Sequence, residues 1–326
     1  MGECSILDEV QRAPDLLSYL QGIVDADRTP GRFLLTGSSQ FELIEAITQS
    51  LAGRTSLLTL LPFSLRELQD AGKAPPTVPD LLFNGLFPPV YDRDIPASVW
   101  LQDYASTYIE RDVREILKIR DTASFRRFVQ LCAGRIGQLI NISSLAADAG
   151  VTRITAQNWL NALEASHLIV LITPWATNLS KRLIKSPKLY FTDPGLAANL
   201  LGVREVSHIV SHPHRGALFE NWVIMELVKI QCHNGQKPSV HFLRDKQGHE
   251  LDAIVETSPN QFQAIEIKSG ATIASDFFKG LDFWKSLLPP DSCHPWLLHG
   301  GEVEQQRERG HVLPWNNFEP LLSRLL

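Results

Sequence analysis

Four residues in the last third of the chain have the types and spacing that suit metal-assisted phosphodiester cleavage: Glu220, Asp252, Glu266 and Lys268. Carboxylate oxygens are preferred Mg²⁺ ligands, so Asp252 and Glu266 could bind one or two Mg²⁺ ions. Lys268 would orient the attacking water or help to deprotonate it, and Glu220 would complete the metal shell. The alternative is a solvated strand face, where the pattern E-x-K is frequent.

These side chains must be positioned by a helix and three strands. The hydrophobic pattern predicts a helix, three strands, a second helix and a fourth strand, at residues 216–231, 240–245, 249–256, 262–269, 273–288 and 295–300. Gly248 marks the first turn between strands, and Pro259-Asn260 marks the second. Because side chains alternate along a strand, Glu266 and Lys268 lie on the same face. A terminal amphipathic segment completes the chain.

With an acid from the helix, an aspartate from a strand and E-x-K from the next strand, this order resembles the PD-(D/E)xK nucleases. The resemblance implies an α/β domain over residues 191–326, in which Glu220, Asp252, Glu266 and Lys268 are catalytic and Mg²⁺ is the cofactor. Folds of this kind also serve as binding modules without cleavage, so both alternatives stay open here.

A second group of acids stands near the start of the chain. The apolar strand Ser5-Ile6-Leu7 ends in Asp8-Glu9, and a second strand over 32–36 ends in Gly37-Ser38-Ser39, with a helix over 16–25 between them. Strands that alternate with helices predict a small parallel α/β sheet. A strand ending in Asp-Glu has the chemistry of a Walker B site, where the aspartate holds the Mg²⁺ shell and the glutamate polarises water.

The run ILDEVQRAPDLLSYLQ, PGRFLLTGSSQ, QSLAGR and LPFSLREL resembles the prokaryotic AAA-type ATPases whose C-terminal half is a domain of uncharacterised function. YIERDVREI, SPKLYFTDPGLAANLLG and GALFENWV extend the resemblance over most of the chain. It implies ATP and Mg²⁺ as cofactors, with Asp8 and Glu9 as the Mg²⁺ and water-activating acids. It also implies that Ser38 is the sensor residue and that Arg54 is a γ-phosphate or subunit-interface arginine.

One departure from this family concerns the phosphate-binding loop GxxxxGK[ST]. The only Gly-Lys pair, Gly72-Lys73, is followed by Ala74, and position 67 is Glu. The expectation is therefore an N-terminally truncated family member that does not hydrolyse ATP alone, with a vestigial ATP and Mg²⁺ site. The competing hypothesis is a non-catalytic interaction protein that partners a full-length paralogue or another copy of itself.

The central part of the chain has the pattern of a winged helix-turn-helix. Ser143-Ser144 are expected to cap a short helix that Gly150 closes, Thr152 to cap a second helix over 153–166, and a strand to follow from His167. DNA contacts are expected from the second helix and from the basic run after it, at Arg153, Gln157, Lys181, Arg182, Lys185 and Lys188. The alternative is a protein-interaction module with a solvated basic face.

Composition and charge set wider limits. The net charge of −5 argues against a uniformly basic nucleic-acid binder, and the four cysteines form no CxxC pair that would suit zinc. Signal-peptide and membrane-span patterns are missing, so a cytoplasmic protein is expected, and the family resemblance implies that its source is a prokaryote. His208, His212 and His214 are interpreted as a loop cluster without function. The predicted domains are a partial AAA-type sheet over 1–75, a mostly helical winged-helix region over 76–190 and the nuclease-like domain over 191–326.

Overall fold

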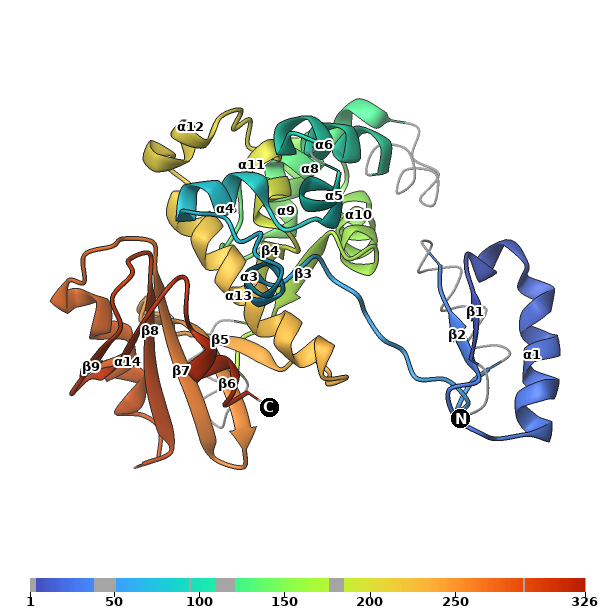
Figure 1. Ribbon diagram of the computed structural model, residues 1–326. Helices are drawn as coiled ribbons and strands as arrows, with labels where there is room; N and C mark the ends of the chain where they lie inside the picture. Colours follow the sequence, from blue (N-terminus) through green and yellow to red (C-terminus); the bar gives the residue numbers. More distant parts are fainter. Residues whose placement is uncertain are drawn as a thin grey trace. The chain divides into compact units, whose positions relative to one another are not determined.

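The computed structural model describes residues 4–37, 51–93, 95–108, 121–175, 185–289 and 291–325. The chain divides into two compact units, Met1–Leu58 and Thr59–Leu326, each described by itself (Figure 1). Helix α3 (Leu65–Asp70) buries Leu65 and Leu68 in the core of the second unit. The first boundary predicted from the sequence, at residue 75, lies after this helix.

A short parallel sheet and one helix form the described part of the first unit. Strand β1 (Ser5–Leu7) pairs with β2 (Phe33–Leu35), which confirms the predicted parallel pairing. The 3-10 turn η1 (Val10–Arg12) and helix α1 (Pro14–Ala26) connect the strands. Proline suits the first helical position, because the N–H that it lacks has no partner there. A small core contains Val10, Leu17, Leu20 and Leu51.

The second unit begins with α3 and continues through the Pro-rich stretch. That stretch contains helices α4 (Val78–Asn84) and α5 (Pro88–Asp92), although the sequence predicts a connection between domains there. Prolines in the first turn of both helices start them rather than interrupt them. Helices α6 (Ala97–Tyr104) and α8 (Thr122–Ala133) follow. The stretch belongs to the core, because Leu81, Leu82 and Leu86 are completely buried.

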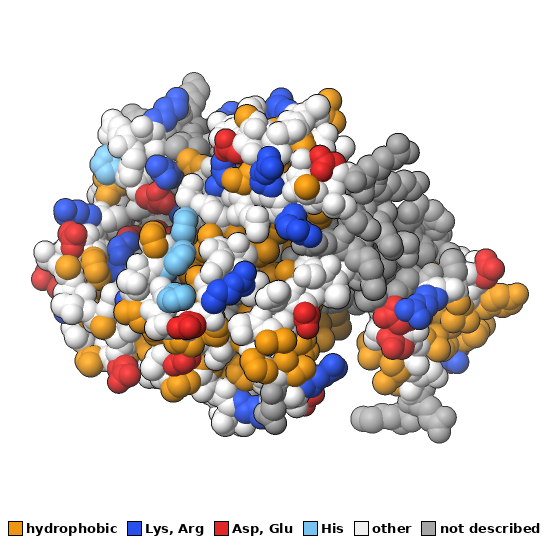
Figure 2. Space-filling model, turned by 90° about the horizontal axis from the view of Figure 1, so that it is seen from above, with side chains coloured by type: hydrophobic (Ala, Val, Ile, Leu, Met, Phe, Trp, Pro, Cys, Tyr) orange, Lys and Arg blue, Asp and Glu red, His pale blue; other side chains and the backbone are white. Residues whose placement is uncertain are grey.

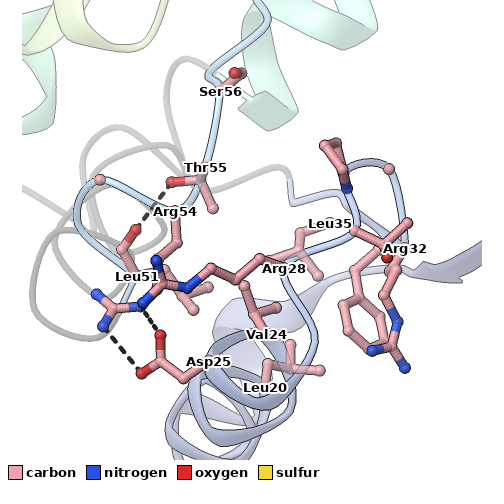
Figure 3. A pocket seen from close by; sticks show the side chains of 15 residues that line it. Leu20, Val24, Asp25, Arg28, Arg32, Leu35, Leu51, Arg54, Thr55 and Ser56 are labelled. Carbon is pink, nitrogen blue, oxygen red and sulfur yellow. Dashed lines mark hydrogen bonds and ion pairs between the residues drawn. The ribbon is translucent and has the colours of Figure 1, made fainter.

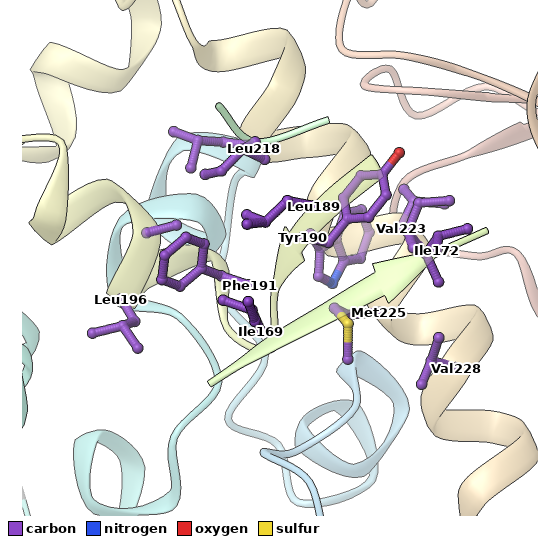
Figure 4. Packing of buried hydrophobic residues seen from close by; sticks show 14 of the residues in the cluster. Ile169, Ile172, Leu189, Tyr190, Phe191, Leu196, Leu218, Val223, Met225 and Val228 are labelled. Atoms are coloured by element: carbon purple, nitrogen blue, oxygen red, sulfur yellow. The ribbon is translucent and has the colours of Figure 1, made fainter. Parts of the chain in front are cut away.

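A helix, a short turn, a second helix and a two-stranded ribbon come next, in the predicted order. They are α9 (Ile142–Ala149), α10 (Arg153–Ala165) and the antiparallel strands β3 (Ile169–Ile172) and β4 (Lys188–Phe191). Figure 4 shows side chains of the ribbon packed against α13 (Arg215–His233), including Ile172 and Tyr190 of the ribbon. The ribbon and this helix therefore share one apolar core.

Two of the three helix ends predicted in this region are confirmed. Gly150 ends α9 with a φ of 74°, and the Thr152 side chain caps α10 by accepting the N–H of Thr155 at 3.1 Å. The predicted cap at Ser143-Ser144 is wrong, because Asn141 caps α9 and accepts the N–H of Ser144 at 3.0 Å. Asparagine caps helices as well as serine does, and it stands two residues earlier.

The rest of the second unit is built around a six-stranded mixed sheet. Helices α11 (Pro194–Leu200) and α12 (Val206–Ser211) precede α13. The elements after α13 are β5 (Val240–Arg244), β6 (Glu250–Ser258), β7 (Gln261–Lys268), η3 (Ser275–Phe278), α14 (Lys279–Lys285), β8 (Cys293–His299), β9 (Gln305–Arg307), β10 (Gly310–Pro314) and α15 (Glu319–Leu322). From α13 to β8 the order of helices and strands is the predicted one. The terminal segment differs from the prediction, because it adds β9 and β10 to the sheet.

Helices cover both faces of this sheet. The strand order is β5-β6-β7-β8-β10-β9, with β8 parallel to β7 and to β10 and the other pairs antiparallel. Ile265 and Ile267 of β7 join the core that contains α13, whereas Ala264 joins the core that contains α14. Alternation therefore places Glu266 and Lys268 on the α14 face. Within the described ranges, no helix combines the length and apolar character that a bilayer span requires.

Candidate functional site

Asp252 and Glu266 stand on neighbouring strands, where β6 begins and β7 ends. The antiparallel register pairs Ala253 with Ile265, so the next opposed residues are Asp252 and Glu266. Lys268 Nζ lies 2.5 Å from Glu266 Oε1 and 3.6 Å from Asp252 Oδ2. We call Asp252, Glu266 and Lys268 the carboxylate cluster. The structure thus gathers three of the four residues that the sequence suggests for catalysis.

The two carboxylates of the cluster have different partners. Asp252 Oδ2 accepts the backbone N–H of Ile267 at 2.8 Å, which fixes the aspartate against β7. Glu266 is only 7 % exposed, and its Oε2 is buried without a hydrogen-bond partner among the described residues. Gly280 of α14 packs closely against this oxygen, because a Cβ added to that glycine would stand only 2.7 Å from it. A buried carboxylate oxygen without a donor is unfavourable unless a cation or water completes its shell.

Burial and mutual repulsion shift the protonation of the cluster. Burial first, and the neighbouring Asp252 second, raise the pKa of Glu266 to about 8, against the opposing effect of Lys268. Burial disfavours the Lys268 ammonium, but Asp252 and Glu266 outweigh it and raise the pKa of Lys268. Without a bound cation, Glu266 therefore holds a proton at neutral pH while Lys268 stays charged. Binding of a cation between the carboxylates would displace that proton.

Glu220, the fourth residue, is held by strand β4 rather than by Lys268. Glu220 Oε1 accepts a hydrogen bond from Tyr190 Oη at 2.6 Å and lies 3.1 Å from Lys188 Nζ. Lys188 also pairs with Glu250, and the other oxygen of Glu250 lies 2.9 Å from Arg244 Nη1. Burial raises the pKa of Glu220, and Lys188 opposes that effect. We call these five residues the Lys188 network.

The network corrects one prediction and adds three residues, Tyr190, Glu250 and Arg244. The sequence predicts that Lys188 contacts DNA phosphates. Lys188 is not available for that contact, because it is only 1 % exposed and paired with two carboxylates. Tyr190 and Glu250 were missed in the sequence. Alternation along a strand is the signal that could have found them, because Tyr190 stands two residues after Lys188 and Glu250 two before Asp252.

The carboxylate cluster fits a hard divalent cation. Mg²⁺ commonly binds one or two protein carboxylates and completes its shell with waters and substrate phosphates. Asp252 and Glu266 supply such a pair of carboxylates beside Lys268. In the part of the chain that the structure describes, no three His, Cys, Asp or Glu side chains are arranged to hold a metal. That statement includes His208, His212 and His214.

In the first unit, the residues suggested for an ATP site are not gathered in one place. Asp8 Oδ1 accepts hydrogen bonds from the Thr36 hydroxyl and, at 3.1 Å, from the Glu9 N–H. Arg54 instead donates to Asp25 through Nε at 2.6 Å and Nη2 at 2.9 Å (Figure 3). The surrounding pocket of about 550 Å³ is lined by some of the residues between 20 and 35 and between 51 and 56, and its described lining contains neither Asp8 nor Glu9. Ser38 lies outside the described residues.

The residues suggested for DNA contact are only partly accessible. Arg153 and Lys185 are exposed, whereas Gln157 is half-buried and donates to Asn161 at 2.8 Å. Lys181 and Arg182 lie outside the described residues. On the face drawn in Figure 2, lysine and arginine side chains are interspersed with acidic ones and with a row of histidines. That view shows mixed charge rather than one continuous basic patch.

Three known protein families match successive parts of the chain. Residues 2–69 match a family described as an AAA domain. Residues 75–207 and 215–318 match two families described as domains of unknown function, DUF8612 and DUF4143. These matches support an AAA-type ATPase-like family. The carboxylate cluster lies within the DUF4143 match, and α9, α10 and the ribbon lie within the DUF8612 match.

Two relatives are uncharacterized proteins of Mycobacterium bovis and Mycobacterium tuberculosis. Each is 32% identical to this chain over 268 residues, which cover 82% of the chain and 58% of the relative. The chain therefore spans little more than half the length of these two relatives. No solved structure matches the chain.

Proposed function

We propose that the second unit cleaves nucleic-acid phosphodiesters with Mg²⁺ at the carboxylate cluster. The observation that supports this best is the position of the Lys268 ammonium, within 2.5 Å of Glu266 and 3.6 Å of Asp252. A lysine beside two metal-binding carboxylates on adjacent strands is the arrangement that PD-(D/E)xK chemistry needs. The sequence of elements from α13 to β8 is also the order of that fold.

Each residue of the cluster has a distinct role in this proposal. Asp252 and Glu266 would hold Mg²⁺, which supplies polarisation of the phosphate and of its bound water. The hydrogen bond from Ile267 keeps Asp252 turned toward the site. Lys268 would hold the attacking water and offset the negative charge that develops on the phosphate. At 32% side-chain exposure it is the most accessible member of the cluster, as contact with a substrate requires.

Nucleic acid would be held by the helix-turn-helix part of the same unit. Helix α10 begins with the exposed Arg153, and the exposed Asn158 lies farther along it. Exposed polar side chains near the N-terminus of the second helix are those that reach base edges in winged helix-turn-helix proteins. Lys185, just before β4, is exposed and could contact a phosphate. These contacts would position the strand and leave cleavage to the carboxylate cluster.

The proposal is tested with purified protein, linear DNA and Mg²⁺, with EDTA as the metal-free reference. Lys268→Ala should lower the cleavage rate by about 100-fold or more, because the water loses the group that positions it. Lys279→Ala is the matched control, since Lys279 is an exposed lysine on α14 outside the cluster. It should leave the rate unchanged.

Two outcomes contradict cleavage by this protein. Activity that survives Lys268→Ala would come from a contaminant. DNA that is retained in Mg²⁺ but never cut would favour the alternative, a non-catalytic binding or interaction module. In that case Arg153→Glu should still weaken retention, because the reversed charge repels phosphate.

A further inference from the structure

Lys188 is a charged side chain in an unusual place. It is the first residue of β4 and only 1 % exposed, yet its ammonium carries a full charge among buried groups. Its Nζ lies 3.1 Å from Glu220 Oε1, contacts Glu250 and stands 5.4 Å from the centre of the Phe242 ring. Burial of an unpaired ammonium would be very costly, so these two carboxylates are the reason that it is tolerated.

The acids of this region form two pairs, and each pair contacts one lysine. Asp252 and Glu266 contact Lys268, whereas Glu220 and Glu250 contact Lys188. The two pairs adjoin each other, because Glu250 and Asp252 are two residues apart on β6. The lysines differ in access to solvent, with side-chain exposures of 32% for Lys268 and 1% for Lys188. Solvent therefore reaches Lys268, whereas Lys188 is enclosed.

A buried ammonium between two carboxylates occupies a place that a hard cation would otherwise suit. Ca²⁺, Mn²⁺ and Mg²⁺ bind carboxylate oxygens at about 2.0–2.6 Å, and neutralisation of paired acids is what makes such positions favourable. Two-metal phosphodiester-cleaving sites place their ions about 3.5–4 Å apart. Glu220 and Glu250 form a second pair of acids beside Asp252 and Glu266, and the Lys188 ammonium lies between them.

We propose that Lys188 is a built-in substitute for a second metal ion, so that the site binds one divalent cation per chain. The inference rests on the proposed function and decides how many ions the four acids accept. Lys188 is then a positioning residue: it neutralises Glu220 and Glu250 and leaves Asp252 and Glu266 as the only pair open to metal. Tyr190, which donates to Glu220, supports the same arrangement from the neighbouring position on β4.

The experiment counts Mn²⁺ ions bound per full-length chain by calorimetric titration, with Mn²⁺ alone as the probe. Wild type should bind one ion. Lys188→Ala removes the ammonium and leaves space between Glu220 and Glu250, so it should bind two. The double variant Lys188→Ala, Glu250→Gln lacks one ligand of the second Mn²⁺ position, so it should again bind one Mn²⁺ ion. Thermal denaturation with and without Mn²⁺ provides a second measurement. Mn²⁺ should raise the Tm of Lys188→Ala by more than it raises the Tm of wild type.

Lys229→Ala is the matched control, because Lys229 is equally buried but forms an ion pair with only one acid of the described residues, Glu226. It should still bind one ion. If Lys188→Ala is unfolded without metal, Mn²⁺ must restore its native tryptophan fluorescence; a chain that stays unfolded in Mn²⁺ overturns the proposal. One ion in Lys188→Ala, or two in wild type, also overturns it. No binding by wild type would instead remove the metal site of the proposed function, and the inference with it.

Discussion

Replacing Glu266 with glutamine should make the second unit more stable in alkaline solution, even though it removes a metal ligand. The pKa of Glu266 rises from an ordinary 4.5 to about 8 in the folded protein. The folded protein therefore binds more protons than the unfolded chain between these pH values. Its free energy of unfolding must fall as pH rises through that window. Glutamine resembles the protonated acid and takes no part in this loss.

The magnitude follows from the pKa. At about 1.4 kcal/mol for each pH unit, a rise from 4.5 to about 8 corresponds to roughly 5 kcal/mol as an upper limit. The gain is smaller than this limit, because Lys268 loses its closest charged partner in Glu266→Gln. The cost of burying the Lys268 ammonium is then less well compensated. We therefore expect the variant to exceed wild type by about 1–3 kcal/mol at pH 9 and to match it near pH 5.

Urea denaturation from pH 5 to 9 in EDTA, followed by tryptophan fluorescence, measures this difference. All seven tryptophans lie between residues 100 and 315, so the signal reports on the second unit alone. Burial raises the pKa of Asp193 to about 6, and its contribution to the pH dependence is the same in both proteins, so it cancels in the difference between the curves. Glu302→Gln, at an exposed glutamate, is the charge-matched control. Parallel curves for wild type and Glu266→Gln across the whole range would refute the reasoning.

Two smaller predictions concern the packing that positions the site. Gly85→Ala should cost about 3 kcal/mol or more, because φ is 65° there and a Cβ would stand 2.2 Å from Asp193 Oδ1. Gly72 has the same φ with nothing within 4 Å of an added Cβ, so Gly72→Ala should lower the free energy of unfolding by only about 1 kcal/mol in urea denaturation. The second prediction concerns helix caps: Thr152→Ala and Asn141→Ala should each lower the free energy of unfolding by about 1 kcal/mol, because each removes the side chain that caps a helix. Ser143→Ala should change stability by less than about 0.5 kcal/mol, and an equal loss there would contradict the cap at Asn141.

Much of the second unit could be predicted from local pattern. The strands that carry Asp252 and Glu266 are short apolar runs bounded by turn residues, and Gly248 and Asn260 take the positive φ values that such turns need. Alternation then fixes which side chains share a face. For this reason the sequence could place Glu266 and Lys268 together before any coordinates were known.

The errors arose where a local pattern fits two structures. Prolines in KAPPTVPD suit a linker, but they also suit the first turn of a helix, and buried leucines decide for the helix. β9 was missed because Gln305–Arg307 is polar, and among the described strands it pairs with β10. β10 was missed because its apolar residues were read as part of a terminal amphipathic segment. Arg54 could not be placed by motif alone, because its partner Asp25 belongs to a helix 29 residues earlier.

Lys188 shows how a charge pattern can mislead and what would correct it. A run of lysines and an arginine after a helix-turn-helix suggests a surface, and nothing in residues 181–188 separates Lys188 from Lys185. The next three residues do, because Leu189, Tyr190 and Phe191 are all buried in β4. A lysine at the start of a strand that is buried on both faces must find acids within the fold, since it cannot remain unpaired there. Glu220 and Glu250 are those acids, and the same requirement that removes Lys188 from the DNA surface ties the ribbon to α13 and to β6, the strand that also carries Asp252.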